Sequence, residues 1–105
     1  MQRARARDQL TLLWRLTVDE LTQLSVDLHS FGPDAAIEQI AAVESRLAAA
    51  RRTLIEVEMA LKKLRSGTYG RCDACERWID VDLLAIHPQH RYCTKCSEPP
   101  AAATG

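Results

Sequence analysis

The chain has 105 residues, a mass of 11.8 kDa and a formal net charge of zero, from 14 Lys and Arg against 14 Asp and Glu. This length allows one domain, or a small module joined to one long element, and it disfavours a large enzyme with a deep cleft. The balanced charge also disfavours non-specific nucleic-acid binding, which depends on clustered Lys and Arg.

Residues 1–7, MQRARAR, are the locally basic part of the chain. They contain no apolar run and therefore do not resemble a secretory signal. No stretch of the roughly eighteen apolar residues needed to cross a bilayer occurs anywhere in the sequence. We therefore expect a cytoplasmic protein without a membrane anchor, and a basic N-terminal arm over residues 1–7.

Two apolar stripes follow within residues 8–66, and each advances in steps of three and four residues, as in a coiled coil. Gly32 and Pro33 interrupt the pattern between them, which predicts a hairpin tip near 29–34. Ser66 and Gly67 close the second stripe, and Gly67 is expected to adopt the left-handed conformation after a helix end. The stripes consist of Leu10, Trp14, Thr17, Leu21, Leu24 and Leu28, and of Ile40, Val43, Leu47, Ala50, Leu54, Val57, Leu61 and Leu64.

Two helices joined by so short a link must run antiparallel, so residues 8–66 are predicted to form a coiled-coil hairpin. The second arm, taken from Pro33 to Ser66, is longer than the first. Folding about the tip then brings Leu10 near Leu54 and leaves apolar residues at the base of the second arm without a partner. We expect the next module to cover these residues, which are Val57, Leu61 and Leu64, with Trp78, Ile79, Leu83, Leu84 and Ile86.

Four cysteines lie in two close pairs, Cys72-x2-Cys75 and Cys93-x2-Cys96, with seventeen residues between the pairs. This spacing lets two tight turns direct four sulfurs at one zinc ion, although a redox-active pair or iron would also use such cysteines. His90 stands three residues before Cys93 and is an alternative ligand. We predict a structural C4 zinc site over residues 67–97, because four thiolates leave no coordination position open for a substrate.

The fold class is therefore all-α dominated: an antiparallel coiled-coil hairpin followed by a small four-cysteine zinc module. Residues 98–105 are poor in large apolar side chains and are expected to form a flexible tail. No catalytic triad, phosphate loop or paired-carboxylate site is recognisable, so we do not expect an enzyme. The basic residues beside the cysteines are predicted either to compensate the charge of the zinc site or to form a face for an acidic partner; they are Arg71, Arg77, Arg91 and Lys95.

The segment ALKKLRSGTYGRCDACERWIDVDLLAIHPQHRYCTKC resembles the zinc-finger region of the DksA/TraR family of bacterial transcription regulators. The resemblance rests on the cysteine spacing, on Tyr69-Gly70 before the first pair, and on the stretch from Leu84 to Pro88. It spans roughly residues 8–97, and it is less specific in the hairpin, where heptads match many proteins. It implies a protein that binds RNA polymerase rather than DNA, with the hairpin inserted in the secondary channel of the enzyme.

The predicted tip matches the family only in part. DksA-like members carry D-x-x-D-x-A there, whereas Asp34 and Ala36 fit the second half and Phe31 occupies the first acidic position. Asp34 has a second explanation, since an acidic residue in the first turn of a helix is stabilised by the helix dipole. Phe31 is interpreted either as an exposed anchor for a partner or as a staple folded onto the hairpin, with the staple favoured.

Other positions also depart from the family. Basic residues that hold guanosine tetraphosphate in some members are replaced by Glu56, His87 and Ser97, which argues against nucleotide-dependent action. Glu76 replaces the usual glycine after the second cysteine, and we expect no counterpart of the family's C-terminal helix. The resemblance therefore indicates a divergent, short member of the family.

Three functions remain open at this point. The first is a transcription regulator that engages RNA polymerase tip first, as a monomer rather than a dimer. The second is an interaction adaptor whose stripes mediate self-association or bind another coiled coil, with zinc purely structural. The third is a thiol sensor, because zinc thiolates can be oxidised with release of the metal.

Overall fold

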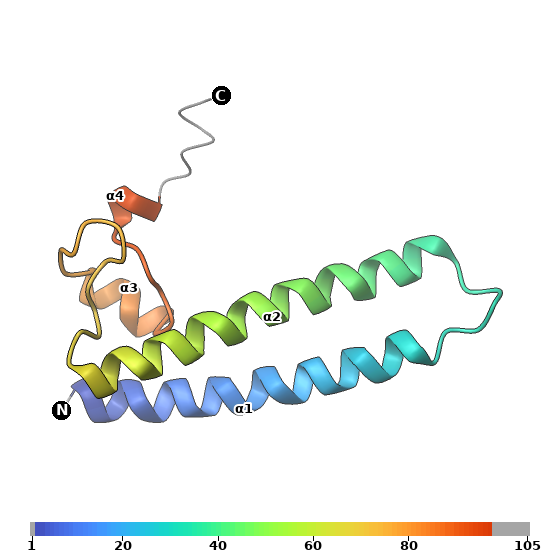
Figure 1. The fold of residues 1–105 in the computed structure, drawn as a ribbon, viewed down its shortest axis with the longest axis horizontal. Helices are drawn as coiled ribbons and strands as arrows, with labels where there is room; N and C mark the ends of the chain where they lie inside the picture. Colours follow the sequence, from blue (N-terminus) through green and yellow to red (C-terminus); the bar gives the residue numbers. More distant parts are fainter. Residues whose placement is uncertain (1, 98–105) are drawn as a thin grey trace.

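The computed structural model describes residues 2–97, and these residues form four helices. The two long helices, α1 (Gln2–His29) and α2 (Ile37–Ser66), run side by side in opposite directions and are joined by a loop at one end of the molecule (Figure 1). Two short helices, α3 (Val81–Ile86) and α4 (Thr94–Ser97), belong to the cysteine module at the other end. The predicted fold class, a helical hairpin followed by a four-cysteine module, is confirmed.

The core of the hairpin follows the two predicted stripes. Thr17 is a polar member of the first stripe that is nevertheless buried, and its hydroxyl donates a hydrogen bond to the Leu13 carbonyl at 2.7 Å. The buried hydroxyl is therefore not left without a hydrogen-bond partner. The other buried stripe residues form two clusters: Leu10 and Val57 lie near the module, together with Ala60, which was not predicted, and Leu24, Leu47 and Ala50 lie nearer the loop.

The two arms are nearly equal in length, which differs from the prediction. α1 has 28 residues and α2 has 30. The first arm is longer than expected because residues 2–7, predicted as a separate basic arm, continue the helix. The second arm is shorter because the loop extends over residues 30–36 instead of 29–34. The predicted tail at 98–105 lies outside the described residues.

This change in arm length changes the pairing of the helices. The predicted approach of Leu10 to Leu54 is wrong, because Leu10 and Val57 lie in one cluster and neither has any exposed side-chain surface. Leu61 and Leu64 pack against the same cluster, so α1 covers the base of α2 without help from most of the module.

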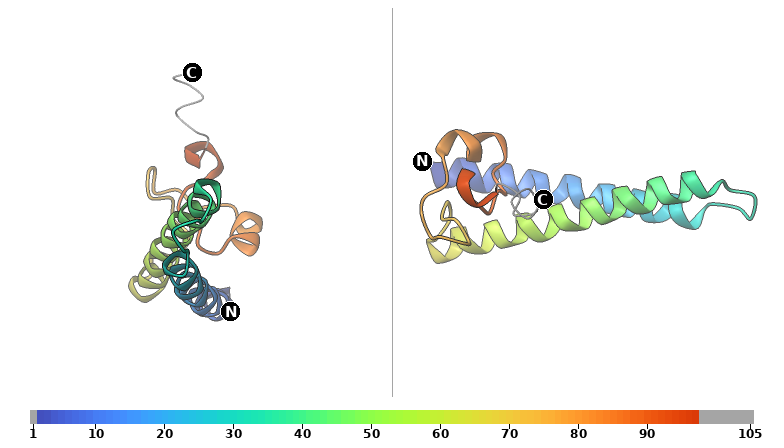
Figure 2. Two further views of the ribbon diagram at one scale, coloured as in Figure 1. Left: turned by 90° about the vertical axis from the view of Figure 1, so that its right-hand side faces the viewer. Right: turned by 90° about the horizontal axis from the view of Figure 1, so that it is seen from above.

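The module contributes fewer apolar contacts than expected. Tyr69 packs against the Leu10 cluster, and Ile79 is buried. Trp78 and Ile86, predicted to cover the base of α2, are instead 66% and 72% exposed. α3 lies beside the first turns of α1 (Figure 2). Leu84 of α3 lines a small hollow there together with α1 residues.

Turn chemistry determines where the long helices end. The Ala35 amide donates to the Gly32 carbonyl at 3.1 Å, which closes a turn with Pro33 in its second position, where the fixed φ of proline is favourable. At the far end of α2, Gly67 has a φ of 80°, as predicted, and the Thr68 amide donates to the Lys63 carbonyl at 2.9 Å.

No helix within residues 2–97 is long and apolar enough to span a membrane.

Candidate metal centre and hairpin tip

The four predicted cysteine ligands converge. Their Sγ atoms all lie within 4.8 Å of one another, and the Sγ atoms of Cys75 and Cys93 are 3.6 Å apart. Four sulfurs bound at about 2.3 Å to one tetrahedral ion stand roughly 3.8 Å from each other. The cluster therefore fits a metal such as zinc with only small movements of the side chains.

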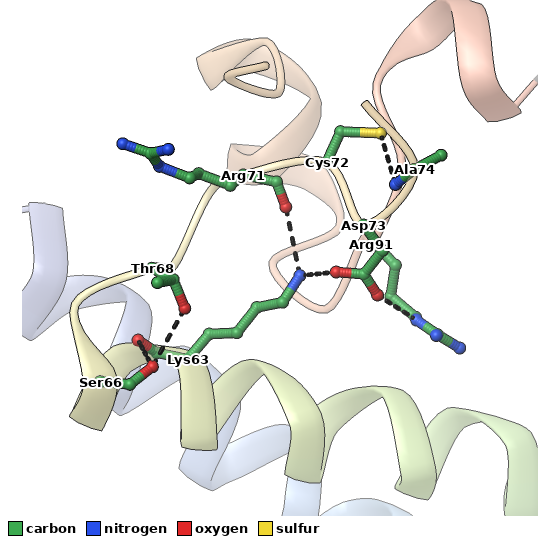
Figure 3. Close-up of polar contacts among 8 residues, drawn as sticks. All are labelled: Lys63, Ser66, Thr68, Arg71, Cys72, Asp73, Ala74 and Arg91. Carbon is green, nitrogen blue, oxygen red and sulfur yellow. Dashed lines mark hydrogen bonds and ion pairs between the residues drawn. The ribbon is translucent and has the colours of Figure 1, made fainter. Parts of the chain in front are cut away.

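Backbone hydrogen bonds shape the turn that carries the first pair. The Cys72 amide donates to the Arg77 carbonyl at 2.7 Å, and the Glu76 amide donates to the Cys72 carbonyl at 2.9 Å. The Ala74 amide points at the Cys72 sulfur, 3.4 Å away (Figure 3). An amide directed at the sulfur stabilises the thiolate, which is the form that binds a metal.

The thiols are unequal in acidity. Burial alone would raise the pKa of Cys72. Hydrogen bonds from the backbone near Cys93, Cys75 and Ala74 outweigh this effect and lower the pKa to about 6. Backbone hydrogen bonding near Cys96 similarly lowers the pKa of Cys93. Hydrogen bonds with the side chains of Cys93 and Cys72 raise the pKa of Cys96 to about 12. Cys96 thus holds a proton that a metal would have to displace.

His90 is not part of the cluster. The metal-ligating group found among residues 2–97 contains the four cysteines alone. The Nε2 atom of His90 is buried without a hydrogen-bond partner in that part of the chain, and its ring lies 6.4 Å from that of His87. The alternative in which His90 replaces a cysteine therefore has no geometric support.

The basic residues around the cysteines have separate surroundings. Arg91 donates from Nε to the Asp73 carboxylate at 2.9 Å, and Lys63 of α2 pairs with the other oxygen of the same carboxylate (Figure 3). The Arg71 guanidinium lies over the Trp78 ring, 5.0 Å from its centre, as in a cation–π contact. Arg77 and Lys95 are exposed.

Sequence reasoning missed Lys63 and Asp73. Burial tends to raise the pKa of Asp73, but hydrogen bonds from Lys63 and Arg91 outweigh this and lower it. No spacing rule relates Lys63, Asp73 and Arg91, because they come from a helix, a turn and a segment without regular secondary structure, which only the tertiary fold brings together. The one signal in the sequence was the position of the charged residue Asp73 between the two cysteines of the first pair.

The tip presents the predicted residues differently from one another. Asp34 and Ala36 are exposed, whereas Phe31 is half-buried. Ala36 is the N-cap of α2, so Asp34 precedes the first helical turn, in which Glu38 is the acidic residue. The helix-dipole explanation of Asp34 is therefore wrong, because the turn around Pro33 delays the start of the helix.

The three positions that replace basic residues lie on different elements. Glu56 is on α2, His87 caps the end of α3 and Ser97 ends α4. The pKa of Arg91 is raised, mainly by its hydrogen bond with Asp73 and to a lesser degree by the charge of Glu56. The negative charge of Glu56 on α2 therefore acts on Arg91 of the module.

These features define a class of fold: an antiparallel helical hairpin with a four-cysteine module folded onto its base. The same fold occurs in the structure of transcription factor DksA2 from Pseudomonas aeruginosa, with a TM-score of 0.69 over 98% of this chain and 85% of that chain, at 23% identity. The predicted resemblance is confirmed at the level of the fold.

Sequence comparison adds a shorter match. An uncharacterised protein of Aquifex aeolicus is 46% identical over 46 residues, which are 44% of this chain and 32% of that protein. The chain therefore matches about a third of the length of this relative. No family model matches the chain.

Proposed function

We propose that this protein is a non-enzymatic transcription factor of the DksA type that binds RNA polymerase. In this proposal the hairpin enters the secondary channel of the polymerase, loop first, and the protein makes no direct sequence-specific contact with DNA. The observation that carries the proposal is the fold, shared over almost the whole chain with DksA2, which is described as a transcription factor.

The dimensions of the hairpin support insertion. Its two helices of 28 and 30 residues are each roughly 42 to 45 Å long, at 1.5 Å per residue. They form a rod two helices wide (Figure 2). With the cysteine module included, the molecule extends over 50 × 38 × 20 Å. Such a rod suits a narrow channel, and Asp34 is exposed in the loop at its end.

In this proposal the cysteine module binds one structural zinc ion through Cys72, Cys75, Cys93 and Cys96. A module of this size buries little apolar surface, so metal binding would supply most of its folding energy, about 10 to 16 kcal/mol for structural zinc sites. The chain's own contribution is the set of turns that aim the four sulfurs and the amides that favour their thiolates.

Two experiments test the partner and the mode of binding. Purified core polymerase from the host is first captured with the tagged protein. A photo-crosslinker is then placed at position 35, beside Asp34, and the crosslinked polymerase peptides are mapped. We expect crosslinks to residues lining the secondary channel. Absence of binding, or crosslinks restricted to the outer surface, would refute the proposed mode.

Asp34 is expected to act on the polymerase after binding. Asp34→Asn keeps the size of the side chain but removes a charge that could act on a magnesium-containing site or its mobile neighbours, so transcriptional effects should fall severalfold while affinity changes by less than about twofold. Promoter assays and binding titrations measure the two quantities. Equal activity of this variant would remove Asp34 from the mechanism.

The alternative of a self-associating adaptor loses part of its basis, because Val57 is fully buried within the monomer. It keeps some support from Leu12 and Leu16, which are 58% and 56% exposed on the outer side of α1. Sedimentation equilibrium separates the two functions. A monomer is expected for the channel-binding protein, and a stable dimer through the hairpin would favour the adaptor.

A further inference from the structure

We propose that Lys63, Asp73 and Arg91 form a clamp that couples metal binding at the cysteine site to the direction in which the hairpin leaves the module. The inference rests on the metal site of the proposed function, but it does not depend on any particular partner.

One carboxylate joins three separate parts of the chain. Asp73 lies between the cysteines of the first pair, and its two oxygens face different cations (Figure 3). Oδ1 pairs with Lys63 Nζ in the last turn of α2, and Oδ2 accepts from Arg91 Nε at 2.9 Å. Arg91 stands two residues before Cys93 of the second pair. The carboxylate thus connects the end of α2 with both halves of the cysteine cluster.

Backbone hydrogen bonds reinforce each of these links. The Asp73 amide donates to the Arg91 carbonyl at 2.8 Å, so the two residues are joined by main chain and side chain. Lys63 Nζ also donates to the Arg71 carbonyl at 3.1 Å, beside Cys72 (Figure 3). The lysine therefore contacts the segment of the first pair at two points and holds it against α2.

The surroundings favour this network over an ordinary surface ion pair. The side chains of Lys63, Asp73 and Arg91 are only 20%, 19% and 29% exposed. Partial burial reduces screening by water and salt. The two cations outnumber the carboxylate by one charge, which is favourable beside thiolates, whose metal complex carries a net negative charge.

Metal binding and clamp formation then assist each other. A metal ion bound to both cysteine pairs fixes Asp73 relative to Arg91, which places the carboxylate within reach of Lys63. In the absence of metal, the two cysteine pairs are free to separate, and the ion pairs of Lys63 and Arg91 with Asp73 are weakened. By linkage, whatever the metal adds to the clamp, the clamp adds to metal affinity by the same factor.

The first test compares two lysines that are adjacent in sequence. Lys63→Met removes the clamp cation but keeps the apolar stem, and Lys62→Met is the matched control. Lys62 is exposed and has no hydrogen bond or ion pair among residues 2–97. Zinc affinity, measured by competition with a chromogenic chelator, should fall about tenfold in Lys63→Met, a size typical of outer-sphere partners, and by less than about twofold in Lys62→Met. Lys63→Arg, which keeps the charge, should recover most of the affinity.

The second test measures the direction of the hairpin. Spin labels are attached through ketone-bearing side chains at Arg77 of the module and at Ala48 of α2, both of which are exposed. The zinc-loaded protein and Lys62→Met should give one narrow distance distribution. Lys63→Met should give a broad one while retaining its helical circular dichroism. Lys63→Gln serves the same comparison if the methionine variant does not fold.

Wild-type zinc affinity in Lys63→Met would overturn the coupling, and a distance distribution as narrow as that of the wild type would overturn the role of the clamp in directing the hairpin. Neither readout involves polymerase, so a clamp that fails leaves the proposed function intact. A protein that fails to bind polymerase can still display the clamp.

Discussion

Glu76 shows how a single residue can carry backbone strain in the cysteine module. It has a φ of 62° and is the non-glycine residue with a positive φ among residues 2–97. It follows Cys75 directly, and its amide donates to the Cys72 carbonyl, so the turn that aims the first two sulfurs requires this conformation. A left-handed conformation costs a residue other than glycine about 1–2 kcal/mol.

Two substitutions at this position should therefore act in opposite directions. Glu76→Gly relieves the strain, but the greater freedom of glycine in the unfolded chain destabilises the folded state by about 0.5–1 kcal/mol. The free energy of unfolding should therefore rise by a net amount of about 0.5–1 kcal/mol. Glu76→Thr should lower the free energy of unfolding by about 1 kcal/mol or more, because a β-branched side chain tolerates positive φ poorly. Denaturant unfolding of the zinc-loaded protein measures both changes. A glycine variant less stable than the wild type would contradict the strain argument.

At the scale of elements, the hairpin depends on a small number of fully buried contacts. Leu10 of α1 packs in one cluster with Val57 and Ala60 of α2, and Tyr69 of the module borders this cluster. It is the place where both long helices and the module meet. The opposite side of α1 carries leucines that remain exposed, so the helix has a distinct inner and outer face.

Leu10 and Leu12 offer a matched pair of substitutions on these two faces. Leu10→Ala leaves a cavity between α1 and α2 and should lower the free energy of unfolding by about 2–5 kcal/mol. Leu12 is 58% exposed, and Leu12→Ala should change the free energy of unfolding by less than about 0.5 kcal/mol. Thermal unfolding followed by circular dichroism compares the two variants. Similar losses in both would show that the outer face of α1 is also buried in solution, for example in a dimer.

At the scale of the whole molecule, protons and metal compete for the same four sulfurs. Cys96, with a pKa of about 12, holds its proton at neutral pH and must release it when a metal binds. Cys72, with a pKa of about 6, is already a thiolate at pH 7 and takes up a proton only as the pH falls. Acidification therefore adds a further competing proton.

The dependence of zinc affinity on pH should reflect these two steps. Between pH 8 and pH 6.5, the proton on Cys96 should make the affinity fall by at least about tenfold per pH unit. Below about pH 6 the fall should become steeper, because Cys72 also binds a proton. Chelator competition at a series of pH values measures the slope. A constant slope through pH 6 would argue against the acidic Cys72 thiol.

Removal of zinc should affect the two parts of the molecule unequally. The hairpin has its own apolar clusters, whereas the module has one isolated β-bridge, between Arg71 and Trp78, and two short helices. We expect a strong chelator to leave most of the helical circular dichroism unchanged while amides of residues 70–96 lose protection from hydrogen exchange. Equal protection with and without zinc would show that the module folds without metal.

Much of the architecture could be predicted from local pattern. The steps of three and four residues placed Leu10, Leu24, Leu47 and Val57 on buried faces, because one helix face repeats at that period whatever lies opposite. The x2 spacing placed each cysteine pair on one turn. Gly67 marked the end of α2, because few other residues adopt a left-handed conformation at low cost.

Only the tertiary structure decided how these parts meet. The register between α1 and α2, and with it the partner of Leu10, depended on where the loop begins and ends, which the turn at Gly32–Ala35 determines. The convergence of Lys63 and Arg91 on Asp73 depends on how the module folds back onto α2. Periodicity and ligand spacing are local properties and can be read along the chain. Register and charge clusters arise from contacts between distant segments, and these exist only once the chain has folded.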